Sequence, residues 1–327
     1  MSEAPKKRGV LLGDWGHYGE VLREIEATGG EIVLVGKAGD DAHPDCQADA
    51  LLRDLTPDFA IVSARPDRIA PLIALAASHG CHVICEKPLA LDIPALSSLR
   101  AAVTAAGVRV CAMLPNRVRP ALAAGVAAIR AGFIGKPVLL SARKTYKWGK
   151  REEWFGDRAA YGGTIPWIGI HALDFIDAAT GGDPVTEATT FHANLDHPGY
   201  PGCEDVCAIS MRLRSGALAS ATLDYFRPDA PVAHGDDFLR VVGTRSELSI
   251  WIDRNRAELL EPGAAPRELA LPAPTPYYTP WILGLPRRGE RCAPDDRTLR
   301  AFRLTLEALR IRDAADTCQP VSIPVLP

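Results

Sequence analysis

The stretch His82-Val83-Ile84-Cys85-Glu86-Lys87-Pro88 decides how the first half of the chain is interpreted. Its apolar, β-branched residues 83–85 are typical of a strand that is buried on both faces of a sheet. Pro88 has no N–H group to donate and restricts the backbone of Lys87, so the strand has to end there. The stretch therefore predicts a lysine at the carboxyl end of a central strand, where open α/β sheets bind their ligands. A surface turn with two solvated charges is the alternative.

A glycine-containing turn follows the first apolar run of the chain. Residues 10–12 predict a short strand, and the apolar spacing from Val21 onward predicts an amphipathic helix. Between them stands Gly13-Asp14-Trp15-Gly16-His17-Tyr18-Gly19. A strand, a glycine turn and a helix in this order are the context of a dinucleotide-binding motif, whose glycines admit the pyrophosphate to the helix N-terminus. The motif is imperfect, because Asp14 occupies its first glycine position and a carboxylate there either repels phosphate or turns away and caps the turn.

The end of the next predicted strand, at residues 32–35, bears on the choice of cofactor. In NAD enzymes an acidic residue about 20 positions beyond the glycine turn binds the adenosine ribose. The corresponding residue here is Lys37, which stands 18 positions after Gly19. Because a lysine can pair with a 2′-phosphate, the sequence favours NADP over NAD. Asp40 and Asp41 follow closely and keep NAD open as the alternative.

Strands and helices alternate through the first 115 residues. Strands are predicted at residues 59–62, 83–85 and 108–113, and helices at residues 69–78 and 93–106. This alternation predicts right-handed βαβ units and a doubly wound, parallel Rossmann sheet, so residues 1–115 are interpreted as an NAD(P)-binding domain. The predicted cofactor contacts follow the strands of this domain and are Asp14, Trp15, Gly16, His17, Tyr18, Gly19, Lys37, Ser63, Arg65, Pro66, Glu86 and Lys87.

The second part of the chain, residues 116–327, has the pattern of an α+β domain with a large open, mainly antiparallel sheet. Ile209, Met211 and Leu213 alternate with polar residues, which indicates antiparallel strands with one buried face. Helices are predicted up to residue 131, from about 170 to 179 and from about 296 to 315. Residues 262–286 are rich in proline and are expected to form an irregular surface loop.

Several motifs occur in a fixed order along the chain. Cys85-Glu86-Lys87-Pro88-Leu89-Ala90 follows the glycine turn, Gly132-Phe133-Ile134-Gly135-Lys136-Pro137 comes next, and Gly162-Gly163 precedes Gly169-Ile170-His171. In these motifs, and over nearly its whole length, the sequence resembles the Gfo/Idh/MocA family, the relatives of glucose–fructose oxidoreductase and inositol dehydrogenase. The Glu-Lys-Pro element is the most specific part of the resemblance.

The resemblance implies hydride transfer between a nicotinamide and a carbon that bears a hydroxyl, on a sugar, polyol or cyclitol. It also implies a cis Lys87–Pro88 bond, and a homodimer or homotetramer formed through the C-terminal sheet. Oxidation of a secondary alcohol needs a base for the hydroxyl proton, and reduction needs an acid to return it. Lys87 is the candidate, because burial and the positive ring of the cofactor favour a neutral amine. Glu86 is expected to orient Lys87 or the backbone.

His171 is the second catalytic candidate, with a hydrogen bond or a proton for the reacting oxygen. A structural histidine on a helix is the alternative. Relatives usually carry an aspartate four residues before this histidine, where the present chain has Trp167. Asp174, three residues after His171 on the same helix face, can take over part of that role. Ordinary dehydrogenase activity is therefore in question, because that carboxylate fixes the tautomer of the histidine or binds substrate hydroxyls.

The substrate is expected to contact polar and aromatic residues of the second domain. Tyr146 and Lys147 belong to a cluster with Lys144 and Trp148 that is typical of sugar sites, although an exposed strand end is the alternative. The predicted substrate contacts are Asn116, Arg117, Tyr146, Lys147, Trp167, His171 and Asp174.

Length and composition limit the remaining function classes. A chain of 327 residues with 47% hydrophobic and 24% charged residues is typical of a globular protein of two domains. The net charge of −3 gives no general attraction to nucleic acid or to an anionic membrane. No signal peptide or membrane span is recognised, so a cytoplasmic location is expected. The eight cysteines lack the C-x₂-C spacing of zinc sites, and we expect reduced core thiols and no metal.

Three functions remain after the sequence alone. The first is an NAD(P)-dependent sugar or polyol dehydrogenase or reductase. The second is a redox-assisted lyase or glycosidase, in which the cofactor oxidises the substrate transiently and is recycled. The third is a non-catalytic, cofactor-binding regulator or sensor, which Asp14 and Trp167 favour.

Overall fold

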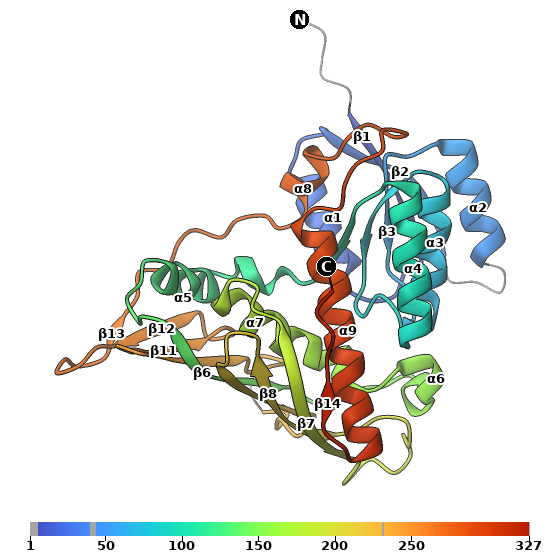
Figure 1. Cartoon of the computed structure of the whole chain (residues 1–327). Helices are drawn as coiled ribbons and strands as arrows, with labels where there is room; N and C mark the ends of the chain where they lie inside the picture. Colours follow the sequence, from blue (N-terminus) through green and yellow to red (C-terminus); the bar gives the residue numbers. More distant parts are fainter. Residues whose placement is uncertain (1–5, 40–43, 231, 327) are drawn as a thin grey trace, which may run out of the picture. The chain divides into compact units, whose positions relative to one another are not determined.

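The computed structural model describes residues 6–39, 44–230 and 232–326 (Figure 1). The chain divides into two units. The first unit comprises Met1–Met113 and Pro276–Thr305, and the second comprises Leu114–Thr275 and Leu306–Pro327. The division proposed from the sequence, between residues 115 and 116, differs from this grouping in residues 114–115 and 276–305.

The first unit contains a five-stranded parallel sheet, as predicted. Its strands are β1 (Lys7–Leu12), β2 (Ile32–Ala38), β3 (Phe59–Val62), β4 (His82–Cys85) and β5 (Val110–Ala112). The order in the sheet is β2-β1-β3-β4-β5. The strand order therefore reverses between β1 and β3, and a doubly wound sheet binds its ligands at the carboxyl ends of such strands.

The helices of the first unit connect these strands. They are α1 (Tyr18–Glu26), α2 (Pro44–Leu55), α3 (Pro66–Ser78), α4 (Ile93–Ala106) and α8 (Thr279–Leu283), and the N-terminal part of α9 (Asp296–Thr317) also belongs here. Helix α3 begins at a proline, which suits the first helical position because its N–H group would have no partner there. Helix α4 begins after Asp92, whose side chain accepts the N–H of Ala95 at 2.7 Å. Sequence analysis missed α2, because few apolar residues define its buried face.

Part of the predicted proline-rich loop is ordered against the first unit. The carboxylate of Glu24, on α1, accepts the backbone N–H groups of Tyr277, Tyr278 and Thr279 at 2.7–3.0 Å. Residues 279–283 then form α8 instead of irregular structure. One side chain on α1 thus fixes the segment that precedes this helix.

The second unit contains a nine-stranded sheet of mainly antiparallel strands, which confirms the predicted fold class. Its order is β13-β12-β11-β10-β6-β9-β8-β7-β14, and only β6 and β9 pair in parallel among the described strands. The strands are β6 (Pro137–Thr145), β7 (Val185–Ala193), β8 (Val206–Leu213), β9 (Leu218–Asp224), β10 (Phe238–Gly243), β11 (Glu247–Trp251), β12 (Arg256–Leu260), β13 (Arg267–Glu268) and β14 (Val321–Ser322).

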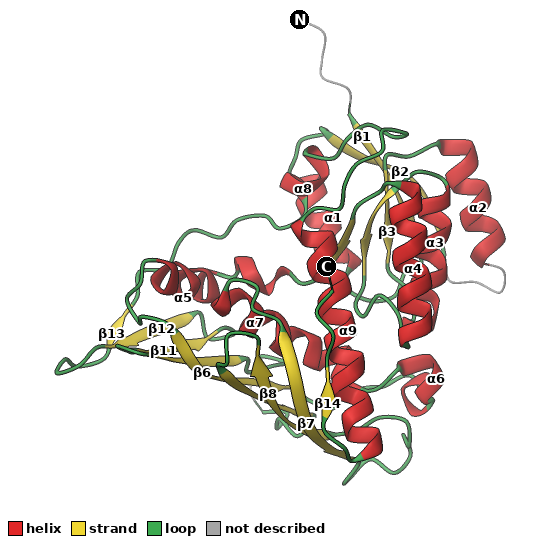
Figure 2. Cartoon of the chain, viewed as in Figure 1, coloured by secondary structure: helices red, strands yellow, loops and turns green. Residues whose placement is uncertain are grey.

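Helices cover one face of this large sheet (Figure 2). They include α5 (Pro120–Arg130) and α7 (Ile170–Thr180), with short turns at η1 (Pro115–Val118), η2 (Glu153–Gly156), α6 (Arg158–Tyr161) and the π-helical turn η3 (Ile165–Gly169). Close approach explains Gly125 on α5, where a Cβ atom would lie 2.3 Å from Ile250 Cδ1. Apolar side chains that point away from the helices stay exposed, among them Leu139, Phe191 and Leu218.

None of the helices within the described part of the chain combines the length and the apolar character needed to cross a membrane. All eight cysteines are free thiols. Five of them are buried, as expected of core thiols, whereas Cys46 and Cys318 are exposed.

Candidate cofactor and substrate sites

The glycine turn after β1 has the backbone conformation that its glycines permit. Gly13 and Gly16 have positive φ angles of 81° and 106°, which other residues rarely adopt. The N–H of Gly13 donates to the carbonyl of Ala38 at 2.8 Å, at the end of the neighbouring strand β2. A Cβ atom on Gly16 would lie 2.5 Å from Glu86 Oε1, so the turn packs directly on that carboxylate. Both glycines are therefore required by the local geometry.

The residue after β3 is tied to the same turn. Ser63 is buried; its carbonyl accepts the N–H of Trp15 at 3.0 Å, and its hydroxyl donates to the carbonyl of Trp15 at 2.7 Å. Arg65 stands before α3 and binds Asp67 through two nitrogens at 2.7 and 2.8 Å, while Pro66 begins the helix. The predicted contacts that follow β1 and β3 thus lie together at the point where the strand order reverses.

Glu86 connects the end of β4 with the glycine turn. Its side chain is fully buried, and its Oε1 accepts the backbone N–H of His17 at 2.5 Å and lies 2.6 Å from the Nδ1 of the same histidine. Burial raises the pKa of Glu86, but the interactions with His17 and the charge of Lys87 outweigh burial, and the net effect lowers the pKa. Glu86 is therefore an anion that holds the glycine turn in place.

Lys87 lies where the sequence predicted it, directly after β4 and before a cis bond to Pro88. Its side chain is only 1% exposed. Such burial excludes the alternative of a solvated surface turn. The backbone N–H of Lys87 donates to Oε2 of Glu86 at 3.3 Å, so the two residues support one another locally.

Lys37, near the end of β2, pairs with Asp14 of the glycine turn. The Nζ atom lies 3.3 Å from Asp14 Oδ2, and both side chains are about half exposed. The charge of the predicted phosphate-binding lysine is thus balanced by the aspartate that replaces the first glycine of the motif. Asp40 and Asp41, which kept NAD open in the sequence analysis, lie outside the described residues.

The first unit fits a dinucleotide at this edge. Tyr18 and Gly19 open helix α1, and the first N–H groups of an α-helix have no partners within the helix. A helix N-terminus that follows a glycine turn attracts a phosphate group through these donors and the helix dipole. Glu86 is buried beneath the turn, where it shapes the backbone. Lys37 lies beside the turn and presents a cation there.

In the second unit, His171 is the second residue of helix α7 and is 7% exposed. The π-helical turn η3 precedes it and contains Trp167. The Trp167 ring lies 6.1 Å from the ring of Phe155 and 6.2 Å from that of Tyr161, measured between centroids. Where relatives are expected to carry an aspartate, this chain therefore has one member of a buried aromatic cluster.

Asp174 and Arg117 bind each other. Arg117 belongs to η1, next to the buried Asn116, and its Nε donates to Asp174 Oδ1 at 2.6 Å. It also donates to Asp177 one turn further along α7. Burial lowers the pKa of Arg117, but the two carboxylates outweigh burial and raise the pKa. In this geometry these two predicted substrate contacts connect η1 with α7.

A buried ion pair lies close to helix α7. Lys144 on β6 contacts Asp237, and their side chains are 2% and 3% exposed. Its Nζ is 4.7 Å from the ring centroid of Tyr146 and 5.5 Å from that of Phe175, which stands four residues after His171 on α7. Because residues four apart share a helix face, the ion pair lies on the side of α7 that carries His171.

The two members of this pair respond differently to burial. Burial raises the pKa of Asp237 to about 6, although Lys144 acts against it. Burial also lowers the pKa of Lys144, but Tyr146 and Asp237 outweigh it and raise the pKa overall. Both groups are assigned as ionised, because the Nζ and Oδ2 atoms are in direct contact. The sequence analysis did not select Asp237; its only local signal is a pair of adjacent acids before a strand.

The polar and aromatic residues after β6 form a continuous cluster. The ring of Tyr146 lies 4.7 Å from that of His234, and the Nζ of Lys147 donates to the carbonyl of Asp229 at 2.8 Å. Trp148 stacks on His197 with a centroid distance of 3.6 Å. These residues line the end of β6 as the sequence predicted, and aromatic faces beside polar groups are suited to sugars.

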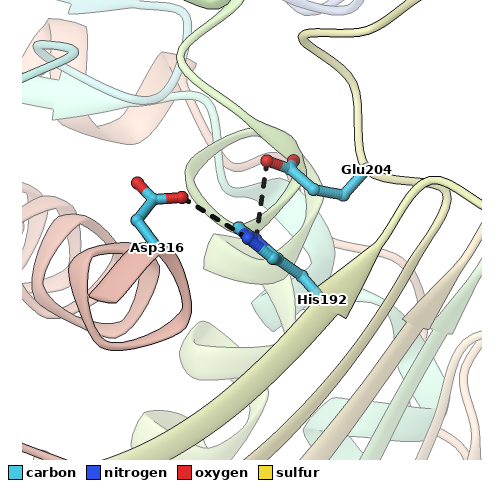
Figure 3. Close-up of side chains that lie close together, drawn as sticks. All are labelled: His192, Glu204 and Asp316. Carbon is cyan, nitrogen blue, oxygen red and sulfur yellow. Dashed lines mark ion pairs between the residues drawn. The ribbon is translucent and has the colours of Figure 1, made fainter. Parts of the chain in front are cut away.

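A second polar cluster joins β7, the loop before β8 and helix α9 (Figure 3). One ligand atom each from His192, Glu204 and Asp316 lies within 4.8 Å of the others, a spacing that a metal ion could use. The guanidinium of Arg158, however, contacts both Glu204 and Asp316. An arginine side chain thus already supplies the positive charge between the two carboxylates.

Comparisons with known proteins give consistent relatives. Residues 36–113 match the model of an oxidoreductase family with an NAD-binding Rossmann fold, and residues 124–249 match the model of the GFO/IDH/MocA C-terminal domain. The D-apiose dehydrogenase of Paraburkholderia graminis is 26% identical over 80% of this chain and 69% of its own. The 1,5-anhydro-D-fructose reductase of Ensifer adhaerens is 27% identical over 61% of this chain and 63% of its own. A solved structure from Thermotoga maritima, 26% identical, has a TM-score of 0.84 and covers 97% of this chain and all of its own.

Proposed function

Because the chain belongs to the GFO/IDH/MocA oxidoreductase family, we propose that it transfers a hydride between a nicotinamide cofactor and a secondary hydroxyl or carbonyl carbon of a sugar, polyol or cyclitol. The two curated relatives are, by name, a D-apiose dehydrogenase and a 1,5-anhydro-D-fructose reductase. A sugar or a closely related polyol is therefore the substrate class that this proposal favours.

The observation that carries the proposal is the buried Lys87 at the carboxyl end of β4, beside Glu86 and the glycine turn. The cofactor, when bound, accepts or supplies the hydride. In the oxidation, Lys87 takes the hydroxyl proton while the hydride leaves the same carbon, and a carbonyl group forms. In the reduction, the protonated Lys87 returns the proton to the carbonyl oxygen.

His171 is proposed to serve the same reaction with a hydrogen bond to the reacting oxygen. Glu86 is proposed to act on the backbone, because its carboxylate holds the turn through His17. Among the predicted substrate contacts, Tyr146 and Lys147 belong to the polar and aromatic cluster after β6, which supports a role in binding substrate hydroxyls.

The N-terminal match favours NAD(H) as the general cofactor class. We propose NADP(H) as the preferred form, and this finer choice rests on Lys37. A 2′-phosphate next to Lys37 would replace Asp14 as its partner. The chain is also proposed to form a homodimer or homotetramer through the exposed face of the nine-stranded sheet, where Leu139 and Leu218 pair across β6 and β9.

The proposed function is tested with a panel of sugars and polyols by following the absorbance of the reduced cofactor. Net reduction or oxidation of the cofactor, stoichiometric with a new carbonyl or hydroxyl product, is expected. Product formation without net change of the cofactor would instead indicate the redox-assisted lyase or glycosidase. Cofactor binding with no product from any substrate would indicate a regulator, an alternative that Trp167 in its aromatic cluster keeps open.

A further inference from the structure

The segment that leads into helix α7 is held by an unusual number of side chains for a turn. Gly162 and Gly163 have positive φ angles of 83° and 105°. A Cβ atom on Gly163 would lie 2.8 Å from Arg158 Nη1 and 3.3 Å from Glu204 Oε2. Thr164 follows with no exposed surface, and η3 and α7 continue directly from it. The chain therefore enters the helix of His171 through a turn with little freedom.

Glu204 makes two hydrogen bonds to this turn. Its Oε2 accepts the backbone N–H of Thr164 at 2.7 Å, and its carbonyl oxygen accepts the Thr164 hydroxyl at 2.5 Å. The Thr164 hydroxyl also lies 3.1 Å from the Tyr161 hydroxyl, so the turn is bound on two sides. Glu204 itself is buried and comes from the loop before β8, far from α7 in sequence. A residue next to the sheet thus fixes the start of the helix.

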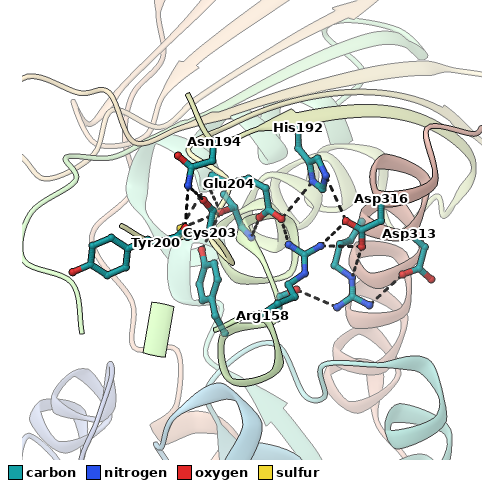
Figure 4. A network of polar contacts seen from close by, with 12 residues as sticks. Arg158, His192, Asn194, Tyr200, Cys203, Glu204, Asp313 and Asp316 are labelled. Atoms are coloured by element: carbon teal, nitrogen blue, oxygen red, sulfur yellow. Dashed lines mark hydrogen bonds and ion pairs between the residues drawn. The ribbon is translucent and has the colours of Figure 1, made fainter. Parts of the chain in front are cut away.

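Charged residues hold Glu204 in turn (Figure 4). Arg158 contacts Glu204 Oε1 through Nη1 and donates to both oxygens of Asp316 at 2.7 and 2.9 Å through Nη2. Arg312, one turn earlier on α9, donates to the carbonyl of Gly162 at 3.1 Å. The ring nitrogens of His192 lie 3.5 Å from Glu204 Oε1 and 3.4 Å from Asp316 Oδ1. The network therefore binds the turn at Gly162 and at Thr164.

We propose that Glu204 is a positioning residue for His171. Its carboxylate fixes the N–H of Thr164, seven residues before His171, and the intervening π-helical turn transmits this position to the start of α7. Loss of the carboxylate releases this N–H group and the hydroxyl network, and the His171 ring then samples other positions. The inference rests on the proposed function only for its catalytic readout.

The matched variants are Glu204→Ala, Glu204→Gln and Asp316→Asn. Glutamine keeps an oxygen for the N–H of Thr164 and loses only the charge, whereas alanine loses both. Asp316→Asn weakens the other contact of Arg158 and leaves every contact of Thr164 in place. For each variant we measure kcat, KM, the binding of the reduced cofactor and the NMR titration of the His171 ring, assigned with His171→Gln.

We expect Glu204→Ala to lower kcat on the order of 10²-fold, because a small misplacement of a catalytic group has effects of this size. Cofactor affinity stays unchanged, the His171 titration shifts, and Glu204→Gln recovers most of the loss. Asp316→Asn behaves as the wild type. Equal losses in Glu204→Ala and Asp316→Asn, in parallel with their melting temperatures, would show a purely structural network and overturn the proposal.

Two further outcomes separate this inference from its rivals. If no substrate is turned over by any form of the protein, the proposed function fails, while a shifted His171 titration in Glu204→Ala still supports the positioning role. An unshifted titration overturns it. A rise in the melting temperature of the wild type with Zn²⁺, absent in His192→Ala and Glu204→Ala, would assign the cluster to a metal and contradict the proposal.

Discussion

Glu86 Oε1 lies 2.6 Å from His17 Nδ1 and also accepts the backbone N–H of His17. The carboxylate at the end of β4 and the turn at the end of β1 are therefore one structural element, although 69 positions separate them in the sequence. The strand β3 stands between β1 and β4 in the sheet, and Ser63 at its end binds the same turn. Three parallel strands thus contribute to the proposed cofactor site.

Removal of the Glu86 carboxylate is expected to destabilise the first unit. Glu86→Ala leaves two donors of His17 without their charged acceptor, which costs about 1.5–3 kcal/mol of unfolding free energy. Glu86→Gln is expected to lose less, because the amide oxygen can still accept one of the bonds. Urea denaturation of the three proteins measures the difference. Equal stabilities would show that the contact with His17 does not hold the turn.

The same residue gives a pH dependence with a defined sign. The pKa of Glu86 is lowered in the folded protein, because His17 and Lys87 outweigh the burial that acts to raise it. Its stabilisation is therefore complete above its ordinary pKa of 4.5 and is lost as the pH falls through the lower, folded value. We expect the difference in unfolding free energy between the wild type and Glu86→Gln to be constant from pH 7 to about 5 and to shrink at lower pH. A difference that grows as the pH falls would contradict the assignment.

Lys37 is expected to set the preference between the two cofactors. Replacement of Lys37 by aspartate should lower the affinity for NADPH relative to NADH about tenfold, the 1.4 kcal/mol of one charge-assisted contact. Asp14→Asn is the matched control: it frees Lys37 from its present partner and should favour NADPH further. Fluorescence titrations with both reduced cofactors measure the ratio. An unchanged ratio in Lys37→Asp would remove the basis for the NADP preference.

The buried pair of Lys144 and Asp237 is expected to respond asymmetrically to substitution. Asp237→Leu alone leaves a buried ammonium group without its partner and should cost about 3–5 kcal/mol, whereas the double variant Lys144→Met with Asp237→Leu should be close to the wild type in stability. Thermal and urea unfolding distinguish the two. If the double variant is folded but has an altered KM, the pair also serves the substrate site through Tyr146. A double variant that is less stable than either single one would show that the charges themselves stabilise the fold.

Much of the first unit could be predicted from local patterns. The apolar run before Pro88 fixed the end of β4, and the order of strand, glycine turn and helix placed the turn at the edge of the sheet. Contacts between distant segments could not be predicted in this way. Nothing near Tyr278 indicates that Glu24 binds its backbone, so the return of residues 276–305 to the first unit was missed. Helix α2 was missed because its apolar face is narrow.

The second unit shows the same limit for the candidate site. Tyr146 was selected from a local cluster, but its neighbours Lys144 and Asp237 meet only because β6 and β10 are adjacent in the sheet. Glu204 has no local signal at all, since its partner Thr164 is 40 residues away. Side chains whose role depends on strand pairing or on one long-range hydrogen bond become visible only in the folded chain.

The central claim is that Lys87 moves the substrate proton during hydride transfer. The most direct measurement is the turnover of Lys87→Met, compared with the wild type on the best substrate of the panel, together with the dissociation constant of the reduced cofactor. We expect kcat to fall by about 10²–10⁴-fold, the usual contribution of a general acid or base, with cofactor affinity unchanged. A Lys87→Met protein that binds the cofactor normally and turns over at the wild-type rate would contradict the account.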